Sequence, residues 1–116
     1  MTTFIAIDFE TANPNFSSIC QVGIAIFKNG VFYDSWESLV NPDDYFDPLN
    51  TSIHGIGEWT VRNAPKWGEV YGQFKLWLKN NIVVSHTLFD QTTLLQACEK
   101  NDIDVLIVLG SIHPES

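Results

Sequence analysis

The segment that most limits the fold lies near the N-terminus, where a short apolar run leads directly into two carboxylates. Phe4 to Ile7 predicts a short buried β-strand, and Asp8 and Glu10 follow it. Because side chains in a strand alternate between faces, both acids project from the same side, about 7 Å apart along the chain. Ionising two such carboxylates in a partly buried place costs free energy. A divalent cation would remove that cost, and carboxylate oxygens are ligands that suit Mg²⁺ and Mn²⁺.

The acidic pair alone is not specific for metal binding. The same residues also suit a strand that frays into a solvated acidic turn. The metal interpretation therefore depends on what the remainder of the chain supplies.

The first forty residues predict an antiparallel meander. Asn13 to Ser18 is a loop, and the almost continuously apolar Ile19 to Phe27 suits a central strand. Asn29-Gly30 then favours a type I′ turn, in which both central residues need a positive φ. Val31 to Val40 is expected to pair back as the third strand.

A long connection and a helix come next. Asn41 to Asn63 is rich in Pro, Asp and Gly and predicts an irregular connection. Pro65 opens a helix with one apolar face, and its aromatic residues Trp67, Phe74 and Trp77 are assigned to packing. The apolar positions are Trp67, Val70, Tyr71, Phe74, Trp77 and Leu78, and the polar face holds Lys66, Glu69, Gln73, Lys75 and Lys79.

The last part of the chain predicts two strands around a second helix. Ile82 to Val84 is a short buried strand, Ser85 to Lys100 a helix, and Val105 to Leu109 a final strand. The expected fold class is α/β, with a mixed sheet that starts as an antiparallel meander and continues with parallel crossovers.

Composition limits the function classes. The 116 residues make one small domain, and the net charge of −8 argues against a broad basic surface for nucleic acid. It does not exclude an enzyme that touches a few nucleotides through metal ions, because bound cations reverse the local field. Without a long apolar run or a signal-peptide pattern, a cytoplasmic protein without membrane contact is expected. Cys20 and Cys98 read as small core residues.

A second group of polar residues follows the predicted strand at 82–84. His86 and Asp90 are four apart and face the same way once a helix begins. The carboxyl edge of an open α/β sheet is where sites form, so Asp90 could meet Asp8 and Glu10 there. Thr87-x-x-Asp90 is equally plausible as a helix-capping box. His86 also suits a hydrogen-bonded core histidine.

These residues together carry a resemblance to a known family. The chain resembles the DEDD 3′-5′ exonuclease superfamily, in its DnaQ-like (DNA polymerase III epsilon subunit-like) branch, over about residues 3 to 100. That resemblance implies a ribonuclease H-like fold. The motifs that carry it are Asp8-Phe9-Glu10-Thr11, Gln21-Val22-Gly23, Asn29-Gly30, Ile53-His54-Gly55-Ile56 and Val84-Ser85-His86-x-x-Phe89-Asp90.

The resemblance also implies a chemistry and a site. Asp8, Glu10 and Asp90 would be the catalytic acids that hold two ions, Mg²⁺ or Mn²⁺, for hydrolysis of phosphodiester bonds. The substrates would be 3′ ends of single-stranded DNA or RNA, and a polymerase or a second copy of the chain is an expected contact. The implied substrate-binding residues are Phe9 (through its neighbouring backbone), Thr11, His54, Ile56, His86 and Phe89.

The sequence departs from the family in its third motif, a His or Tyr followed within about five residues by a fourth acid. Only three residues follow His113. Residues 1–104 are therefore expected to form an incomplete exonuclease-like domain, and 105–116 an atypical tail. The expected activity is poor. The alternatives are an inactive remnant that still binds metal or nucleic acid, and a plain α/β domain.

Overall fold

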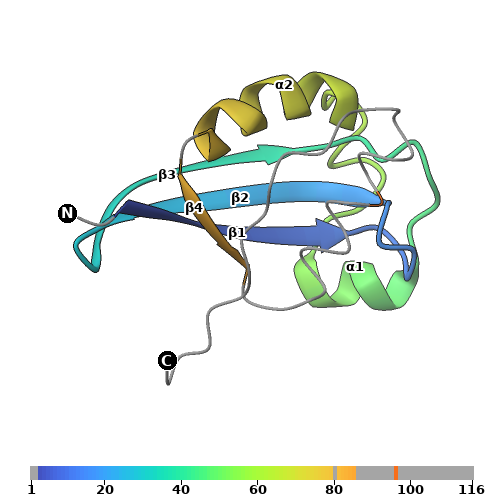
Figure 1. The fold of residues 1–116 in the computed structure, drawn as a ribbon. Helices are drawn as coiled ribbons and strands as arrows, with labels where there is room; N and C mark the ends of the chain where they lie inside the picture. The colour runs from blue at the N-terminus through green and yellow to red at the C-terminus, as the bar shows by residue number, and fades with distance from the viewer. Residues whose placement is uncertain (1–2, 80, 86–95, 97–116) are drawn as a thin grey trace.

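A four-stranded mixed sheet forms the centre of the structure, a computed structural model that describes residues 3–79, 81–85 and 96 (Figure 1). The strands are β1 (Thr3–Thr11), β2 (Ile19–Lys28), β3 (Val31–Leu39) and β4 (Ile82–Ser85), in the spatial order β3-β2-β1-β4. β2 pairs antiparallel with both β1 and β3, and β4 pairs parallel with β1. The predicted meander followed by a parallel crossover is confirmed.

The turn between β2 and β3 has the predicted geometry. Asn29 and Gly30 have φ values of 54° and 78°, which a type I′ turn requires. The turn sets the first pairs, with Lys28 opposite Val31 and Phe27 opposite Phe32. An irregularity between Ile26 and Phe27 then shifts the register by one residue, so that Gly23 lies opposite Glu37.

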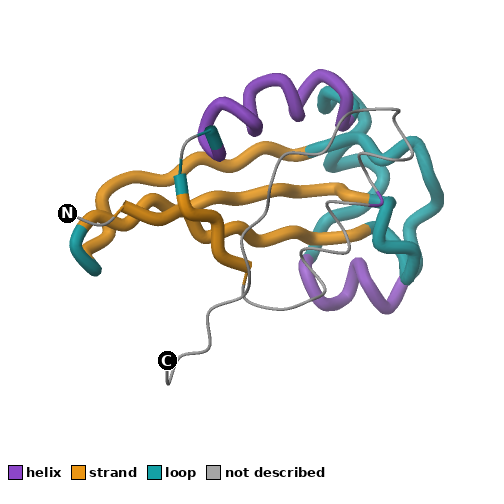
Figure 2. Tube along the Cα trace, viewed as in Figure 1, coloured by secondary structure: helices purple, strands orange, loops and turns teal. Residues whose placement is uncertain are grey.

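One face of the sheet is covered by α2 (Trp67–Leu78), as Figure 2 shows. The helix buries the face predicted from its periodicity, and Trp77 packs against the same core while partly buried. Phe74 is fully buried, with ring centroids 6.0 Å from Phe9 and 5.5 Å from Trp67. The assignment of the aromatic residues to packing is therefore confirmed. The buried residues of α2 are Trp67, Val70, Tyr71, Phe74 and Leu78.

β1 is longer than the apolar run predicted. The strand continues past Ile7 to Thr11, with Asp8 paired to Gly23 and Glu10 paired to Gln21 of β2. The two acids therefore belong to a paired strand, and the alternative of a frayed acidic turn is wrong. Pairing with β2 along the whole strand, and with β4 from Phe4 to Ile7, holds the side chains of β1 in fixed directions.

The connection between residues 41 and 63 is not irregular throughout, which corrects the prediction. It contains α1 (Pro48–His54), which begins after Asp47 and ends at Gly55. The Asp47 side chain accepts a hydrogen bond from the Leu49 N–H, at 2.8 Å. Gly55 adopts the left-handed conformation with φ 75°, and its N–H donates to the carbonyl of Thr51. Asp, Pro and Gly, which suggested a loop by composition, here act as helix caps.

Several predictions concern residues outside the described ranges. They are the helix at 85–100, the strand at 105–109, the domain boundary at 104, and the core position of Cys98. Of the predicted helix, Gln96 is described and helical, whereas Ser85 belongs to β4, which corrects the predicted start. Cys20 is buried and free, which confirms its assignment to the core. Across the described part of the chain, no helix is long and apolar enough to cross a membrane.

The C-cap of α1 gives a matched test of this geometry. An added Cβ meets no atom within 4 Å at either Gly55 or Gly72, but only Gly55 has a positive φ. We expect Gly55→Ala to lower the free energy of unfolding by about 1–2 kcal/mol, because alanine disfavours the left-handed region. Gly72→Ala, inside α2, should raise it by roughly 0.5–1 kcal/mol. Urea unfolding measures both, and equal effects of the two substitutions would contradict the cap.

Candidate active site

The two acids of β1 lie on the face of the sheet opposite the core. Ile7 and Phe9 are 3% exposed, whereas Asp8 between them is exposed and Glu10 is partly buried. This alternation confirms that Asp8 and Glu10 share one side of the strand. The packing of α2 against the other side therefore determines where both carboxylates point.

The position of Glu10 disfavours its charge. Burial raises the pKa of the Glu10 carboxyl above its ordinary value of 4.5, and the charge of Asp8 raises this pKa further. A positive charge on His54 would lower the pKa, but the hydrogen bonds of that ring, described below, favour its neutral form. Glu10 therefore carries a cost on ionisation that a cation beside both acids would offset.

A small cavity of about 160 Å³ opens beside Glu10. Its other walls come from Thr11 at the end of β1 and from three residues of α1: Asn50, Ile53 and His54. Asn50 and His54 are four residues apart and so lie on one side of the helix. Both bind the carbonyl of Thr11, Asn50 through its Nδ2 at 3.3 Å and His54 through its Nε2 at 2.8 Å. Those two contacts hold α1 against the acidic end of β1.

The hydrogen bonds of His54 define its tautomer. The N–H of Ile56 donates to Nδ1 at 3.0 Å, so Nδ1 is unprotonated and the ring proton resides on Nε2. Nε2–H then donates to the Thr11 carbonyl, which can only accept. The ring is therefore neutral and acts as a bridge between the end of α1 and the end of β1.

A buried loop residue supports the same arrangement. Asn13 is fully buried, and its Nδ2 donates to the carbonyl of Tyr45 at 2.9 Å while its Oδ1 accepts from the N–H of Asn15. The N–H of Asp47 donates to the carbonyl of Ala12 in the same region. The segment that leads into α1 is thus tied to the segment that leaves β1.

Cys20 lies close to this site without belonging to it chemically. Its Sγ is 3.9 Å from His54 Nε2. Burial, reinforced by the charge of Glu10, raises the pKa of the Cys20 thiol to about 12. The thiol is therefore protonated at neutral pH and is a poor nucleophile or metal ligand.

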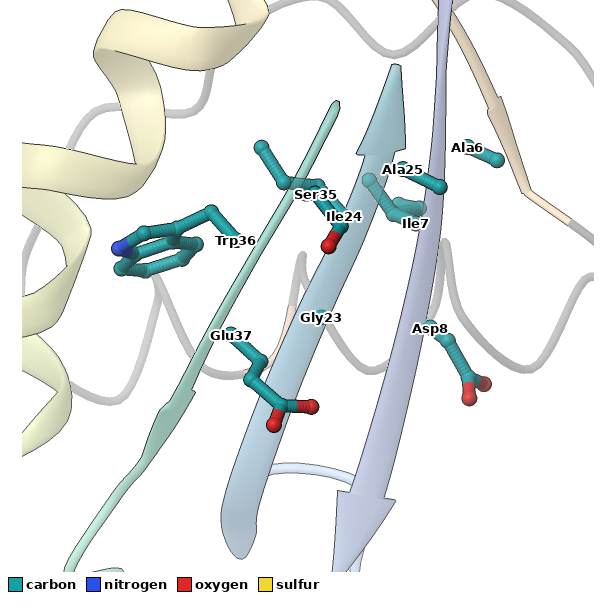
Figure 3. A pocket seen from close by; sticks show the side chains of 9 residues that line it. All are labelled: Ala6, Ile7, Asp8, Gly23, Ile24, Ala25, Ser35, Trp36 and Glu37. Atoms are coloured by element: carbon teal, nitrogen blue, oxygen red, sulfur yellow. The ribbon is translucent and has the colours of Figure 1, made fainter. Parts of the chain in front are cut away.

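Asp8 also borders a shallow trough of about 420 Å³ on the face of the sheet opposite α2. The trough exists because Ala6, Gly23, Ala25 and Ser35, which lie along it, have small side chains or none. Figure 3 shows the Glu37 carboxylate at the same end of the trough as Asp8. Strand β2 lies between the strands of these two acids, and at this level it contributes Gly23, which has no side chain. The Cα atoms of the two acids are therefore roughly 10 Å apart, two strand spacings.

Sequence reasoning did not find three of these residues. Glu37 could not be placed from the Asn29-Gly30 turn alone, because the register shift between Ile26 and Phe27 decides that Glu37 lies opposite Gly23. Asn50 required recognition of α1, for which the Asp47-Pro48 and Gly55 caps were the available signal. Asn13 carried no local signal, because its role arises from a contact 32 residues away.

The predicted site residues divide into those the structure positions and those it does not describe. Asp8, Glu10 and His54 come together at the end of β1, where Asp8 borders the trough and the other two line the small cavity. His86, Phe89 and Asp90 lie outside the described residues, so their roles stay predictions. Phe9, Thr11 and Ile56 have buried side chains, which leaves mainly their backbone groups for a substrate.

The chemistry of the donor set fits a hard divalent cation. Asp8 and Glu10 offer only carboxylate oxygens, which suit Mg²⁺ or Mn²⁺. Within residues 3–79, 81–85 and 96, no third His, Cys, Asp or Glu joins them in a metal-sized group. A further ligand from this chain would have to come from outside those ranges.

Comparison with known proteins identifies the family. A family model for exonucleases of the RNase T type matches residues 5–107. The chain belongs to this exonuclease family. The resemblance to DEDD-type exonucleases is thereby confirmed.

Related proteins contain this exonuclease domain within much longer chains. The domain is 29% identical over 105 residues to the PolC-type DNA polymerase III of Oceanobacillus iheyensis, covering 88% of this chain and 7% of that protein. It is 30% identical over 106 residues to the PolC-type polymerase of Caldanaerobacter subterraneus, covering 88% and 8%. It is also 26% identical over 100 residues to the 3′-5′ exonuclease DinG of Staphylococcus aureus, covering 84% and 11%.

Solved structures share the fold of the exonuclease domain. The nuclease domain of 3′hExo, a DEDDh family member bound to rAMP, superposes with a TM-score of 0.76 at 18% identity, covering 88% of this chain and 60% of that one. The E. coli ExoI–ssDNA complex gives 0.77 at 16% identity, covering 90% and 25%. The ribonuclease H-like fold predicted from the motifs is confirmed.

The raised pKa of Glu10 is directly testable. Asp8→Asn should lower the Glu10 pKa toward 4.5 without reaching it, because burial, the larger cause, remains. Carboxyl-carbon NMR titration in EDTA measures this change. The control is Glu69→Gln, which changes an exposed residue of α2 and should leave the Glu10 pKa unchanged. The account of the acidic pair would be wrong if Asp8→Asn also left it unchanged.

The same shift predicts the direction of a stability change. The folded state holds a proton on Glu10 at pH values just above 4.5, where the unfolded chain has released it. The contribution of Glu10 to the free energy of unfolding therefore falls as pH rises through that window. Cation binding needs the ionised carboxylate, so metal affinity should rise over the same window.

Proposed function

We propose that this exonuclease domain hydrolyses phosphodiester bonds at nucleic-acid 3′ ends, with Asp8, Glu10 and Asp90 as the acids that hold divalent cations. The ions would be Mg²⁺ or Mn²⁺, two in the complete site that the family resemblance implies. Cations held there would activate the attacking water and neutralise the charge that develops on the phosphate. The chain's own acids would position this chemistry at the end of β1.

The observation that carries the proposal is the pair of carboxylates on one side of a strand that pairs with β2 along its whole length and with β4 as far as Ile7. Asp8 and Glu10 cannot turn away from each other without breaking the pairing of β1 with β2. Their mutual repulsion is therefore built into the sheet, and it persists until a cation or a proton is bound.

The parallel pairing of β4 supports Asp90 as the third acid. Ser85 pairs with Ile7, so β4 ends beside the position where Asp8 begins the acidic segment. Asp90 lies five residues further along the sequence. A carboxylate delivered from that point is within the expected reach of the Asp8–Glu10 pair, which favours the ligand role over the helix cap.

Single-stranded DNA or RNA ends are the proposed substrates. Relatives include a 3′-5′ exonuclease and polymerases, and one structural neighbour is bound to rAMP and another to ssDNA. His54 and the backbone near Phe9, Thr11 and Ile56 would line the terminal nucleotide, with His86 and Phe89 beside it. Contact with a polymerase or a second copy is part of the proposal.

For residues 1–116 taken alone, a second candidate function is binding without hydrolysis. These residues contain no match to the fourth acid of the family pattern. Loss of a positioned general base typically lowers a rate by about 10²–10⁴. Release of nucleotides from 3′-labelled oligonucleotides by the 116-residue chain separates the two candidates. Rates near those of complete family members would eliminate the second.

Cation binding by the acidic pair predicts a change in thermal stability. Mn²⁺ at about 100 times its dissociation constant should stabilise the domain by about 2.7 kcal/mol and raise Tm accordingly. Asp8→Ala should abolish that rise, because it removes one of the two described ligands.

The control for this experiment is Glu69→Ala, which removes an exposed acid from α2 on the other side of the sheet. This variant should keep the full Mn²⁺-dependent rise in Tm. An equal rise in wild type, Asp8→Ala and Glu69→Ala would show that Mn²⁺ binds elsewhere.

A further inference from the structure

The small cavity beside Glu10 presents hydrogen-bond acceptors that are not used by the protein. Asn50 donates through Nδ2 to the Thr11 carbonyl, which requires its Oδ1 to face the other way. Neither Asn50 Oδ1 nor the Glu10 carboxylate has a hydrogen-bond partner among the described residues. Both residues are partly buried and line the same cavity. Partly buried acceptors of this kind favour a ligand that donates to both of them.

The remaining polar groups that the described residues bring to the cavity disfavour an anionic ligand there. The Nε2–H of His54 is already bound to the Thr11 carbonyl, and the Thr11 side chain is 5% exposed. From the described part of the chain, the cavity therefore offers a carboxylate and an amide oxygen, with Ile53 as an apolar wall. A phosphate would meet repulsion from Glu10, whereas two neighbouring hydroxyl groups would satisfy both acceptors.

We propose that Asn50 selects ribonucleotide 3′ ends by accepting a hydrogen bond from the 2′-hydroxyl of the terminal ribose. Glu10 accepts from the 3′-hydroxyl of the same sugar. This inference rests on the proposed function, because it places the terminal nucleotide beside the acidic pair. It adds the class of substrate, RNA ends in preference to DNA ends.

The chemistry of the sugar assigns each hydroxyl to its acceptor. Glu10 is the acceptor nearer to Asp8, where the proposed site holds the phosphate. In ribose, O3′ is closer than O2′ to the carbon that carries the 5′-phosphate. O3′ therefore matches Glu10, and O2′ matches Asn50 on α1. Because DNA lacks only the 2′-hydroxyl, a deoxyribose would leave Asn50 Oδ1 unpaired.

Binding of mononucleotides tests the assignment without requiring catalysis. Calorimetric titration in Mg²⁺ would compare 5′-AMP with 2′-deoxy-AMP and 3′-deoxy-AMP. Wild type should bind 5′-AMP about three- to tenfold more tightly than 2′-deoxy-AMP, the range typical of one neutral hydrogen bond. Asn50→Ala should remove that preference while leaving the affinity for 2′-deoxy-AMP nearly unchanged.

Two further variants keep the test specific. Ser52→Ala changes an exposed residue of α1 outside the cavity and should keep the wild-type preference. Asn50→Leu tests whether filling the space without an oxygen also removes the preference, and the Tm of each variant reports whether α1 is intact. If Asn50→Ala does not fold, Asn50→Leu takes its place in the comparison.

The possible failures are distinguishable. Equal affinities of wild type for 5′-AMP and 2′-deoxy-AMP, or an Asn50→Ala variant that retains the preference, would overturn the role of Asn50 while leaving the proposed function in place. If Asn50→Ala instead lost the preference for 5′-AMP over 3′-deoxy-AMP, the assignment of the two hydroxyls would be overturned. Absence of binding by all three nucleotides would overturn this inference and the nucleotide site of the proposed function together.

Discussion

The pairing register of β1 is the constraint on which the site depends. Ile5, Ile7 and Phe9 face the core under α2, and the alternate positions therefore place Asp8 and Glu10 on the opposite face. A slip of one residue would exchange the two sets and bury both carboxylates among apolar side chains. The free energy that stabilises the core thus also fixes the direction of the acids. Stability and site geometry are properties of the same nine-residue strand.

The site combines this rigid strand with groups brought from a distant part of the chain. α1 contacts the end of β1 through Asn50 and His54, and Asn13 and Asp47 tie the preceding segments together. These contacts lie beside Glu10, which is partly buried, whereas Asp8 is exposed. Because Glu10 is partly buried, desolvation is the larger cause of its raised pKa, and the charge of Asp8 is the second cause. It also gives the two acids different neighbours, a small cavity for one and a broad trough for the other.

Local patterns were sufficient to predict the meander and α2, because each of these elements is specified by its own residues. The Asn29-Gly30 turn and the apolar face around Phe74 are examples, and both have the predicted structure. α1 was missed because Asp, Pro and Gly were interpreted by composition and not by position. Glu37 and Asn13 act through contacts with residues far along the chain, which no window of sequence displays. The family motifs pointed to Asp8, Glu10 and His54, which lie together at one end of the sheet, and the roles of these residues and of Asp90 stay predictions.

Paramagnetic NMR with Mn²⁺ tests the central claim most directly, namely that Asp8, Glu10 and Asp90 hold a cation together at the end of β1. Substoichiometric Mn²⁺ broadens the amide signals of residues near the ion. The account predicts early broadening at Asp8, Glu10 and Asp90, with Leu76 on the exposed side of α2 unaffected at the same Mn²⁺ concentration. Broadening at residues 8–10 that leaves Asp90 sharp would contradict the three-acid site. Broadening elsewhere in the chain with these three signals unchanged would contradict the metal site altogether.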